Sequence, residues 1–116
     1  MNYSASGPGQ VPAPRELLEA LAQAARTACA REDAAYEVWD ASRTNRRQLF
    51  EWGRAAGVVD GLIAALELVR ATADPHGVYM VQLREDDRRF LAGLTSPRDR
   101  RRPVVIGPAE CDRQKS

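Results

Sequence analysis

The clearest pattern in the sequence is a long segment in which apolar residues recur every three or four positions. Between Arg15 and Trp52 the chain contains neither Gly nor Pro, and helix-forming residues dominate 16–37. This spacing places apolar side chains on one side of an α-helix. It predicts a first helix over about 14–40, with Pro14 in its first turn. The expected buried stripe consists of Leu17, Leu21, Ala24, Ala28, Ala35 and Val38.

A polar interval, 40–45 (DASRTN), follows this segment. Asp, Ser, Thr and Asn side chains compete with the backbone for hydrogen bonds, so they favour turns and helix caps. We expect the first helix to end here and Thr44 or Asn45 to cap a second helix. The alternative is one continuous helix. The second helix is predicted to end near residue 73, before the turn-forming sequence at 74–77 (DPHG).

The second predicted helix carries two features on different sides. Each glycine in a helix costs about 1 kcal/mol relative to Ala, so a row of three indicates either close approach of another backbone or a break in the helix. At 100° per residue, this row and an apolar seam lie more than a third of a turn apart. The row is Gly53, Gly57, Gly61 and Ala65, and the seam is Leu49, Trp52, Ala56, Val59, Ile63 and Leu66.

A helix that is apolar on most sides is buried on most sides. The first helix covers one side of the second, so we expect a second copy to cover another in a coiled-coil-like helical-bundle dimer. The alternative is that the C-terminal elements cover it within one chain. The glycine row resembles a membrane helix-packing motif, but Asp60 and Glu67 interrupt the segment, and we predict no membrane contact.

Shorter elements are expected beyond the hairpin. Segment 78–83 (VYMVQL) has the Val and Tyr content of a strand, 85–94 reads as a short helix with an acidic first turn, and 104–106 is a candidate second strand. The predicted fold is thus mainly α, an antiparallel hairpin over 14–73 with a strand-helix-strand appendage. The helical domain covers 14–94, between a disordered tail at 1–13 and a flexible basic tail at 95–116.

A helix-turn-helix is the alternative interpretation of 49–66, with Gly57 in the turn. The run Arg54–Val58 (RAAGV) resembles the turn of bacterial repressors of the tetracycline-repressor type, which would imply a small DNA-binding regulator. However, a recognition helix reads bases with Arg, Lys, Asn, Gln or Ser. The outward positions here would be Val59, Asp60, Gly61, Ala64 and Glu67, so DNA binding by this segment is not favoured.

The net charge of +1 gives no global argument for nucleic-acid or membrane binding. The arginines nevertheless cluster, and each cluster is either a solvated surface or a contact for nucleic acid or an acidic partner. An acidic row at Asp33, Glu37 and Asp40, with Glu32 adjacent, is interpreted as a solvated face complementary to the arginines at 43–54. The candidate contact residues are Tyr36, Trp39, Arg43, Arg46, Arg47, Arg98, Arg100, Arg101 and Arg102.

Signatures of catalysis are missing from the sequence. It contains no CxxC, no HxxxH and no glycine-rich phosphate loop, and Cys29 and Cys111 are far apart. We therefore predict no catalytic, cofactor-binding or metal-binding residues. The expected function is non-catalytic: a self-associating adaptor, scaffold or modulator of a partner protein. The first residues do not resemble a signal peptide, which favours the cytoplasm. A bacterial cytoplasmic homodimer is the expected form.

Overall fold

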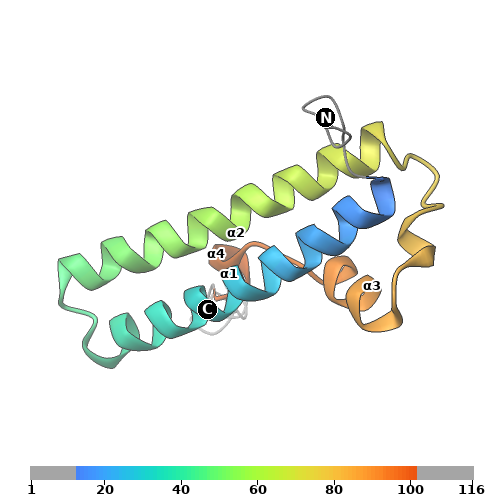
Figure 1. Ribbon diagram of the computed structural model, residues 1–116. Helices are drawn as coiled ribbons and strands as arrows, with labels where there is room; N and C mark the ends of the chain where they lie inside the picture. Colours follow the sequence, from blue (N-terminus) through green and yellow to red (C-terminus); the bar gives the residue numbers. More distant parts are fainter. Residues whose placement is uncertain (1–12, 102–116) are drawn as a thin grey trace, which may run out of the picture.

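The computed structural model describes residues 13–101, and most of them belong to two long helices that form an antiparallel hairpin (Figure 1). These are α1 (Pro14–Ser42) and α2 (Arg46–Thr72). The shorter elements that follow are a 3-10 helix, η1 (Met80–Gln82), and two helices, α3 (Glu85–Ala92) and α4 (Pro97–Arg100). The predicted helical hairpin is therefore confirmed.

The connection between the long helices is built by local hydrogen bonds. Arg43 adopts the left-handed conformation (φ 61°), and its backbone N–H bonds to the carbonyl of Trp39, which ends α1. The Asn45 side chain then accepts hydrogen bonds from the backbone N–H groups of Arg47 and Gln48 at 2.9 and 3.1 Å. These bonds satisfy two free donors at the start of α2. The break at 40–45 and the Asn45 cap are confirmed, which excludes one continuous helix.

Helix α2 continues without interruption through all three glycines. The helix-turn-helix interpretation of 49–66 is wrong, because it requires a turn at Gly57 and the structure places that residue inside a helix of 27 residues. Alanine, leucine and arginine on either side are strong helix formers. They extend the backbone hydrogen-bond ladder across Gly57, where a single glycine lowers helix stability without ending the helix.

The core between the two long helices is narrow and rich in alanine. It contains Leu18, Ala22, Ala25 and Ala28 from α1 and Ala56, Val59 and Leu66 from α2. The expected stripe on α1 was wrong except at Ala28: Leu17, Leu21 and Ala35 are half-buried, and Ala24 and Val38 are exposed. Neighbouring alanine-rich stripes have nearly the same apolar content, so periodicity did not distinguish the buried one.

The predicted strand at 78–83 is also wrong, because this segment contains η1 and turns. The reason is the carboxylate of Asp74, which is only 3% exposed and accepts hydrogen bonds from the backbone N–H groups of Tyr79 and Met80, both at 2.9 Å. These bonds hold the segment in turns and a 3-10 helix, and Met80 and Leu83 are buried in one core cluster with Leu18. No strand occurs between residues 13 and 101, and the candidate strand 104–106 lies outside the described residues.

The short helix predicted at 85–94 is present as α3, which ends at Ala92. It is attached to α1 by an ion pair between Arg26 and Asp87 (2.7 Å), and the Arg26 guanidinium also stacks on Phe90. The chain then returns along the hairpin to α4, which lies beside the middle of the long helices (Figure 1). Residues 97–100, expected in the basic tail that begins at 95, thus form a helix in contact with α2.

Candidate interaction surfaces

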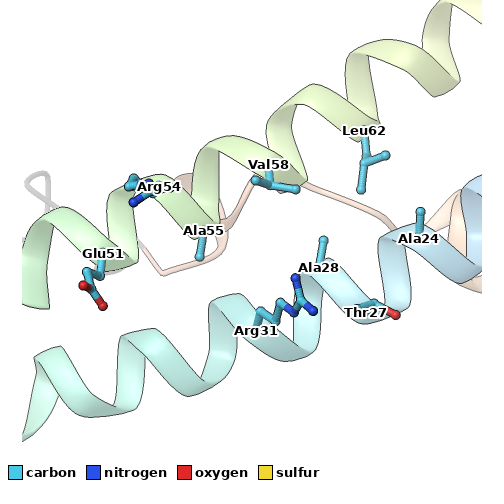
Figure 2. Close-up of a pocket in the computed structure, with 9 residues that line it drawn as sticks. All are labelled: Ala24, Thr27, Ala28, Arg31, Glu51, Arg54, Ala55, Val58 and Leu62. Atoms are coloured by element: carbon cyan, nitrogen blue, oxygen red, sulfur yellow. The ribbon is translucent and has the colours of Figure 1, made fainter.

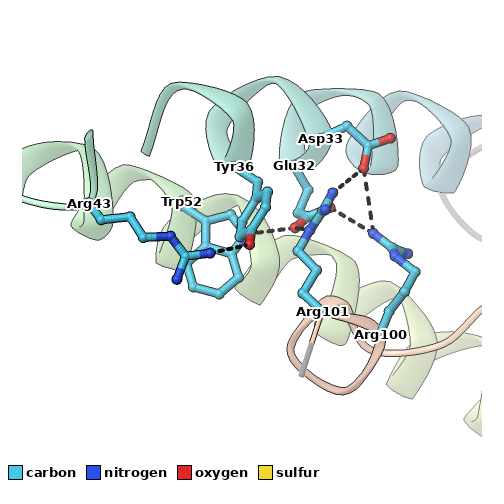
Figure 3. Close-up of polar contacts among 7 residues, drawn as sticks. All are labelled: Glu32, Asp33, Tyr36, Arg43, Trp52, Arg100 and Arg101. Atoms are coloured by element: carbon cyan, nitrogen blue, oxygen red, sulfur yellow. Dashed lines mark hydrogen bonds and ion pairs between the residues drawn. The ribbon is translucent and has the colours of Figure 1, made fainter. Parts of the chain in front are cut away.

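The most densely bonded polar site lies where α4 meets the hairpin, around the carboxylate of Glu32 (Figure 3). This side chain is 0% exposed, which is unusual for a glutamate. Oε1 accepts hydrogen bonds from Arg100 Nη2 and Arg101 Nη2 at 2.7 and 3.0 Å. Oε2 accepts from Arg101 Nε at 2.7 Å and from the indole N–H of Trp52 at 2.6 Å. We call these four residues the Glu32 cluster.

Aromatic rings and a second carboxylate surround the Glu32 cluster. Tyr36 and Trp52 pack edge to face with ring centroids 5.3 Å apart, and the Arg101 guanidinium stacks over the Tyr36 ring at 4.0 Å. The Tyr36 hydroxyl accepts a hydrogen bond from Arg43 at 3.0 Å. Asp33 pairs with Arg101 and lies 3.7 Å from Arg100. The site therefore joins α1, α2 and α4 through cation, carboxylate and aromatic contacts.

The environment of Glu32 determines its protonation. Burial by itself would raise the pKa of this carboxyl, but hydrogen bonds from Arg101 and Trp52, together with the charges of Arg101 and Arg100, outweigh it and lower the pKa. Hydrogen bonds and the charge of Glu32 also raise the pKa of Arg101. With four donors on its two oxygens, the carboxylate is saturated. It is suited to anchoring α4 and not to accepting a proton from a substrate.

The other candidate arginines divide between paired and solvated positions. Arg98 bonds to Asp60 at 3.0 Å and to the backbone carbonyl of Gly53 at 3.4 Å, which ties α4 to α2. Arg43 pairs with Asp40 at 2.6 Å. Arg47 forms an exposed ion pair with Glu51 at 3.6 Å. Arg46 is exposed, and Arg102 lies outside the described residues. The acidic row is thus not wholly solvated: Glu32 and Asp33 pair with Arg100 and Arg101, and of the arginines at 43–54 Arg43 pairs with Asp40.

On another side of the hairpin, α1 and α2 border an apolar groove of about 680 Å³. Figure 2 shows Ala55, Val58 and Leu62 on α2 facing α1 across this space. Most of the side chains that line the groove are small or apolar, and its charged side chains are those of Arg31, Glu51 and Arg54. The lining residues are Ala24, Thr27, Ala28, Arg31, Glu51, Arg54, Ala55, Val58 and Leu62.

The outer side of α2, next to this groove, is apolar and exposed. Phe50 is 65% exposed, Val58 56% and Leu68 63%, while Gly57 and Gly61 lie between them along the helix. A side-chain carbon added at Gly57 or Gly61 would meet nothing within 4 Å, whereas one added at Gly53 would lie 3.8 Å from Arg98. We use the term open face for the groove together with Phe50, Gly57, Gly61 and Leu68.

The glycine row and the seam therefore have different surroundings. Of the predicted seam, Ala56, Val59 and Leu66 are buried against α1, Trp52 and Ile63 are half-buried, and Leu49 is 41% exposed. Within the described chain, the close neighbour expected for the glycine row is absent at Gly57 and Gly61. Ala65, the last residue of the glycine row, is half-buried. Of the two aromatic candidate contact residues, Trp39 is half-buried and Tyr36 packs against Trp52 of the Glu32 cluster.

The burial of two acidic residues was missed by the sequence interpretation. Glu32 was grouped with an acidic surface, although it continues the spacing of Leu18, Ala22, Ala25 and Ala28 on the buried side of α1. That continuation was the available signal. Asp74 was assigned only to a turn. Its burial depends on bonds to amides five and six residues later, which no short motif specifies.

Other kinds of site are not evident in residues 13–101. No group of three or more His, Cys, Asp or Glu side chains in this range could hold a metal ion. Cys29 is a free, half-buried thiol; burial raises its pKa, partly countered by Arg100. Within the same range, no helix combines the length and apolar character needed to cross a bilayer.

No protein-family model, curated protein or solved structure matches this chain.

Proposed function

We propose that this protein is a non-catalytic helical interaction module that binds a helix of another chain on its open face. One observation carries the proposal: the large exposed apolar side chains Phe50, Val58 and Leu68 lie on one helix beside an apolar groove. Exposed apolar side chains gathered along one helix beside a groove are typical of protein-binding sites. A groove between two helices also provides the shape into which a third helix packs.

The division of charge over the hairpin supports this proposal. The side that carries α4 is closed by charged contacts from Arg98, Arg100 and Arg101. In the open face, charged groups are confined to Arg31, Glu51 and Arg54. A polar edge beside an apolar centre is the arrangement found in protein interfaces. Adaptor, scaffold and modulator roles all require such a surface, and a helical-bundle dimer is one assembly that would use it.

Nucleic-acid binding, the other function considered from the sequence, receives less support. Arg98, Arg100 and Arg101 are paired with Asp60, Glu32 and Asp33, so each phosphate contact would compete with an existing ion pair. We therefore base the proposed function on the open face.

Site-specific photo-crosslinking tests the proposed function. A photoreactive amino acid is placed at Val58 in the open face or at Arg84, which is exposed before α3. The expected result is a discrete protein crosslink from position 58 whose linked peptide, identified by mass spectrometry, belongs to an amphipathic helix. Position 84 should give no such product. Absence of a discrete crosslink at position 58, or the same products from both positions, would contradict the proposal.

A further inference from the structure

We propose that the open face binds a second copy of this chain, with the two α2 helices antiparallel and crossing at the level of Val59 along the helix axis, Val59 itself remaining buried against α1. This inference rests on the proposed function and names the partner of the open face. In this arrangement Gly57 and Gly61 of each copy lie at the helix crossing, where the two backbones approach most closely.

The surroundings of the glycines support a contact with another chain. All three α2 glycines lie within a regular helix, and the only glycine with a positive φ among the described residues is Gly77. Backbone conformation therefore does not require glycine at 57 or 61. Packing inside the described chain does not require it either, because a side-chain carbon at either position would have open space. Close approach of a second helix is the remaining physical use of two such exposed positions.

The spacing of residues on this side of α2 identifies a second copy as the occupant. Gly57 follows Phe50 by seven residues, and Leu68 follows Gly61 by seven residues. Seven residues are about two helical turns, so these four residues lie near one line along the helix. Both the outer pair and the inner pair have Val59 as their midpoint.

A pattern that is symmetric about its centre is complementary to itself when reversed. In an antiparallel pair centred at Val59, Phe50 of one copy lies opposite Leu68 of the other, and Gly57 lies opposite Gly61. Both contacts then occur twice by two-fold symmetry, as in most protein dimers. Bulky side chains meet at the two ends of the contact, and the centre leaves room for the backbones.

Charge selects the antiparallel orientation over the parallel one. Arg46, Arg47 and Arg54 lie in the first third of α2, accompanied by Glu51, while Glu67 and Arg70 near its C-terminal end balance each other. A parallel pair would place the arginine-rich ends of both copies side by side, which is unfavourable for like charges. The antiparallel pair separates them and brings each beside the C-terminal end of its partner helix, where Glu67 and Arg70 leave no net positive charge. It also opposes the two helix dipoles.

Association is tested by sedimentation of the full-length chain over a range of concentrations. The wild type is expected to be dimeric at tens of micromolar. Gly57→Leu should weaken dimerisation by about tenfold to a hundredfold because the side chain would separate the crossing helices. Ala30→Leu introduces the same side chain at an exposed position of α1 outside the groove, and it should leave dimerisation unchanged. Gly61→Ala adds only a methyl group at the helix crossing and favours the helix itself. It should also weaken the dimer, by less than Gly57→Leu.

Orientation is tested by distances between spin labels in a chain carrying Cys29→Ala and Cys111→Ser. A label is attached at Arg47→Cys in one sample and at Glu67→Cys in another, both exposed on α2. With 1.5 Å rise per residue, an antiparallel pair centred at Val59 places the two copies of residue 47 about 36 Å apart along the axis and those of residue 67 about 24 Å apart. A parallel pair would give short and similar distances at both sites.

The outcomes separate this inference from the proposed function. A monomer at tens of micromolar, or a dimer unaffected by Gly57→Leu and Gly61→Ala, overturns the inference. So does a dimer with short, equal distances at both labels. In each case a discrete helix crosslink at Val58 would still support an interaction module, whereas its absence would remove the proposed function as well.

Discussion

Two sides of the same helical hairpin have opposite surface chemistry. Beside α4, the carboxylate of Glu32 is completely buried and has four hydrogen-bond donors. On the open face, Phe50 and Leu68 are mostly exposed. Residue type alone would assign the glutamate to the surface and the two apolar residues to the core. The return of a short helix with two arginines, followed directly by Arg101, therefore decides which side of the hairpin is closed.

The largest expected effect comes from removing the carboxylate that closes the α4 side. Glu32→Ala leaves the guanidiniums of Arg100 and Arg101 and the indole N–H of Trp52 without their shared acceptor. We expect a loss of about 2 to 3 kcal/mol in the free energy of unfolding, below the full cost of breaking a buried pair because both arginines are partly exposed. Urea denaturation of the wild type and of Glu32→Ala measures this loss.

Glu37→Ala is the matched control, because Glu37 is an exposed glutamate on the same helix. It should change the free energy of unfolding by less than about 0.5 kcal/mol. Equal losses for the two variants would show that the Glu32 cluster does not stabilise the fold.

The next largest effect is the loss of stability expected when Val59, but not its neighbour Val58, is shortened to alanine. Val59 is 0% exposed in the contact with α1, whereas Val58 is 56% exposed on the open face. Val59→Ala should lower the free energy of unfolding by about 2 kcal/mol through lost burial and a small cavity. Val58→Ala should change it by less than about 0.5 kcal/mol in dilute protein. Chemical denaturation at low concentration is the measurement, and a larger loss at Val58 would mean that α2 is rotated relative to α1.

Acid should weaken the contacts that hold α4 against the hairpin. The pKa of Glu32 is lower in the folded protein, so its ionised form adds stability above the ordinary glutamate pKa of about 4.3. That stability is lost as the pH falls below this value through the folded-state pKa. The expected loss is smaller than that for Glu32→Ala because the protonated side chain remains in place.

The measurement is the free energy of unfolding between pH 7 and pH 3, compared with Glu32→Gln. Trp52 fluorescence, recorded in a Trp39→Phe background, reports on the cluster directly. The variant should lose less stability on acidification than the wild type. Identical pH profiles would show that other carboxyls account for the acid response.

The smallest expected effect is a gain in stability on the open face. Gly57→Ala adds a methyl group where nothing lies within 4 Å and replaces a poor helix former. We expect the isolated chain to gain up to about 1 kcal/mol in free energy of unfolding. Gly77→Ala should instead destabilise the fold, because Gly77 has a φ of +73°. Thermal unfolding in dilute protein distinguishes the two variants. A loss of stability for Gly57→Ala would show that this position is packed within one chain.

Local sequence determined the helical framework. The absence of Gly and Pro from 16–51, the polar interval at 40–45 and the Asn45 cap specify two helices and the turn between them. The acidic first turn specifies α3 in the same way. Such features act through hydrogen bonds and dihedral preferences within a few residues. Prediction from sequence therefore succeeded for these elements.

Tertiary structure alone decided which surfaces are buried. Several alanine stripes on α1 had similar apolar content, and the position of α2 selected the one that includes Ala22 and Ala25. The strand preference at 78–83 was overridden by the buried carboxylate of Asp74. Glu32 became a buried anchor because Arg100 at the end of α4 and Arg101 directly after it, nearly seventy residues later, reach its carboxylate. These outcomes depend on contacts between distant segments, whose energies no local pattern contains.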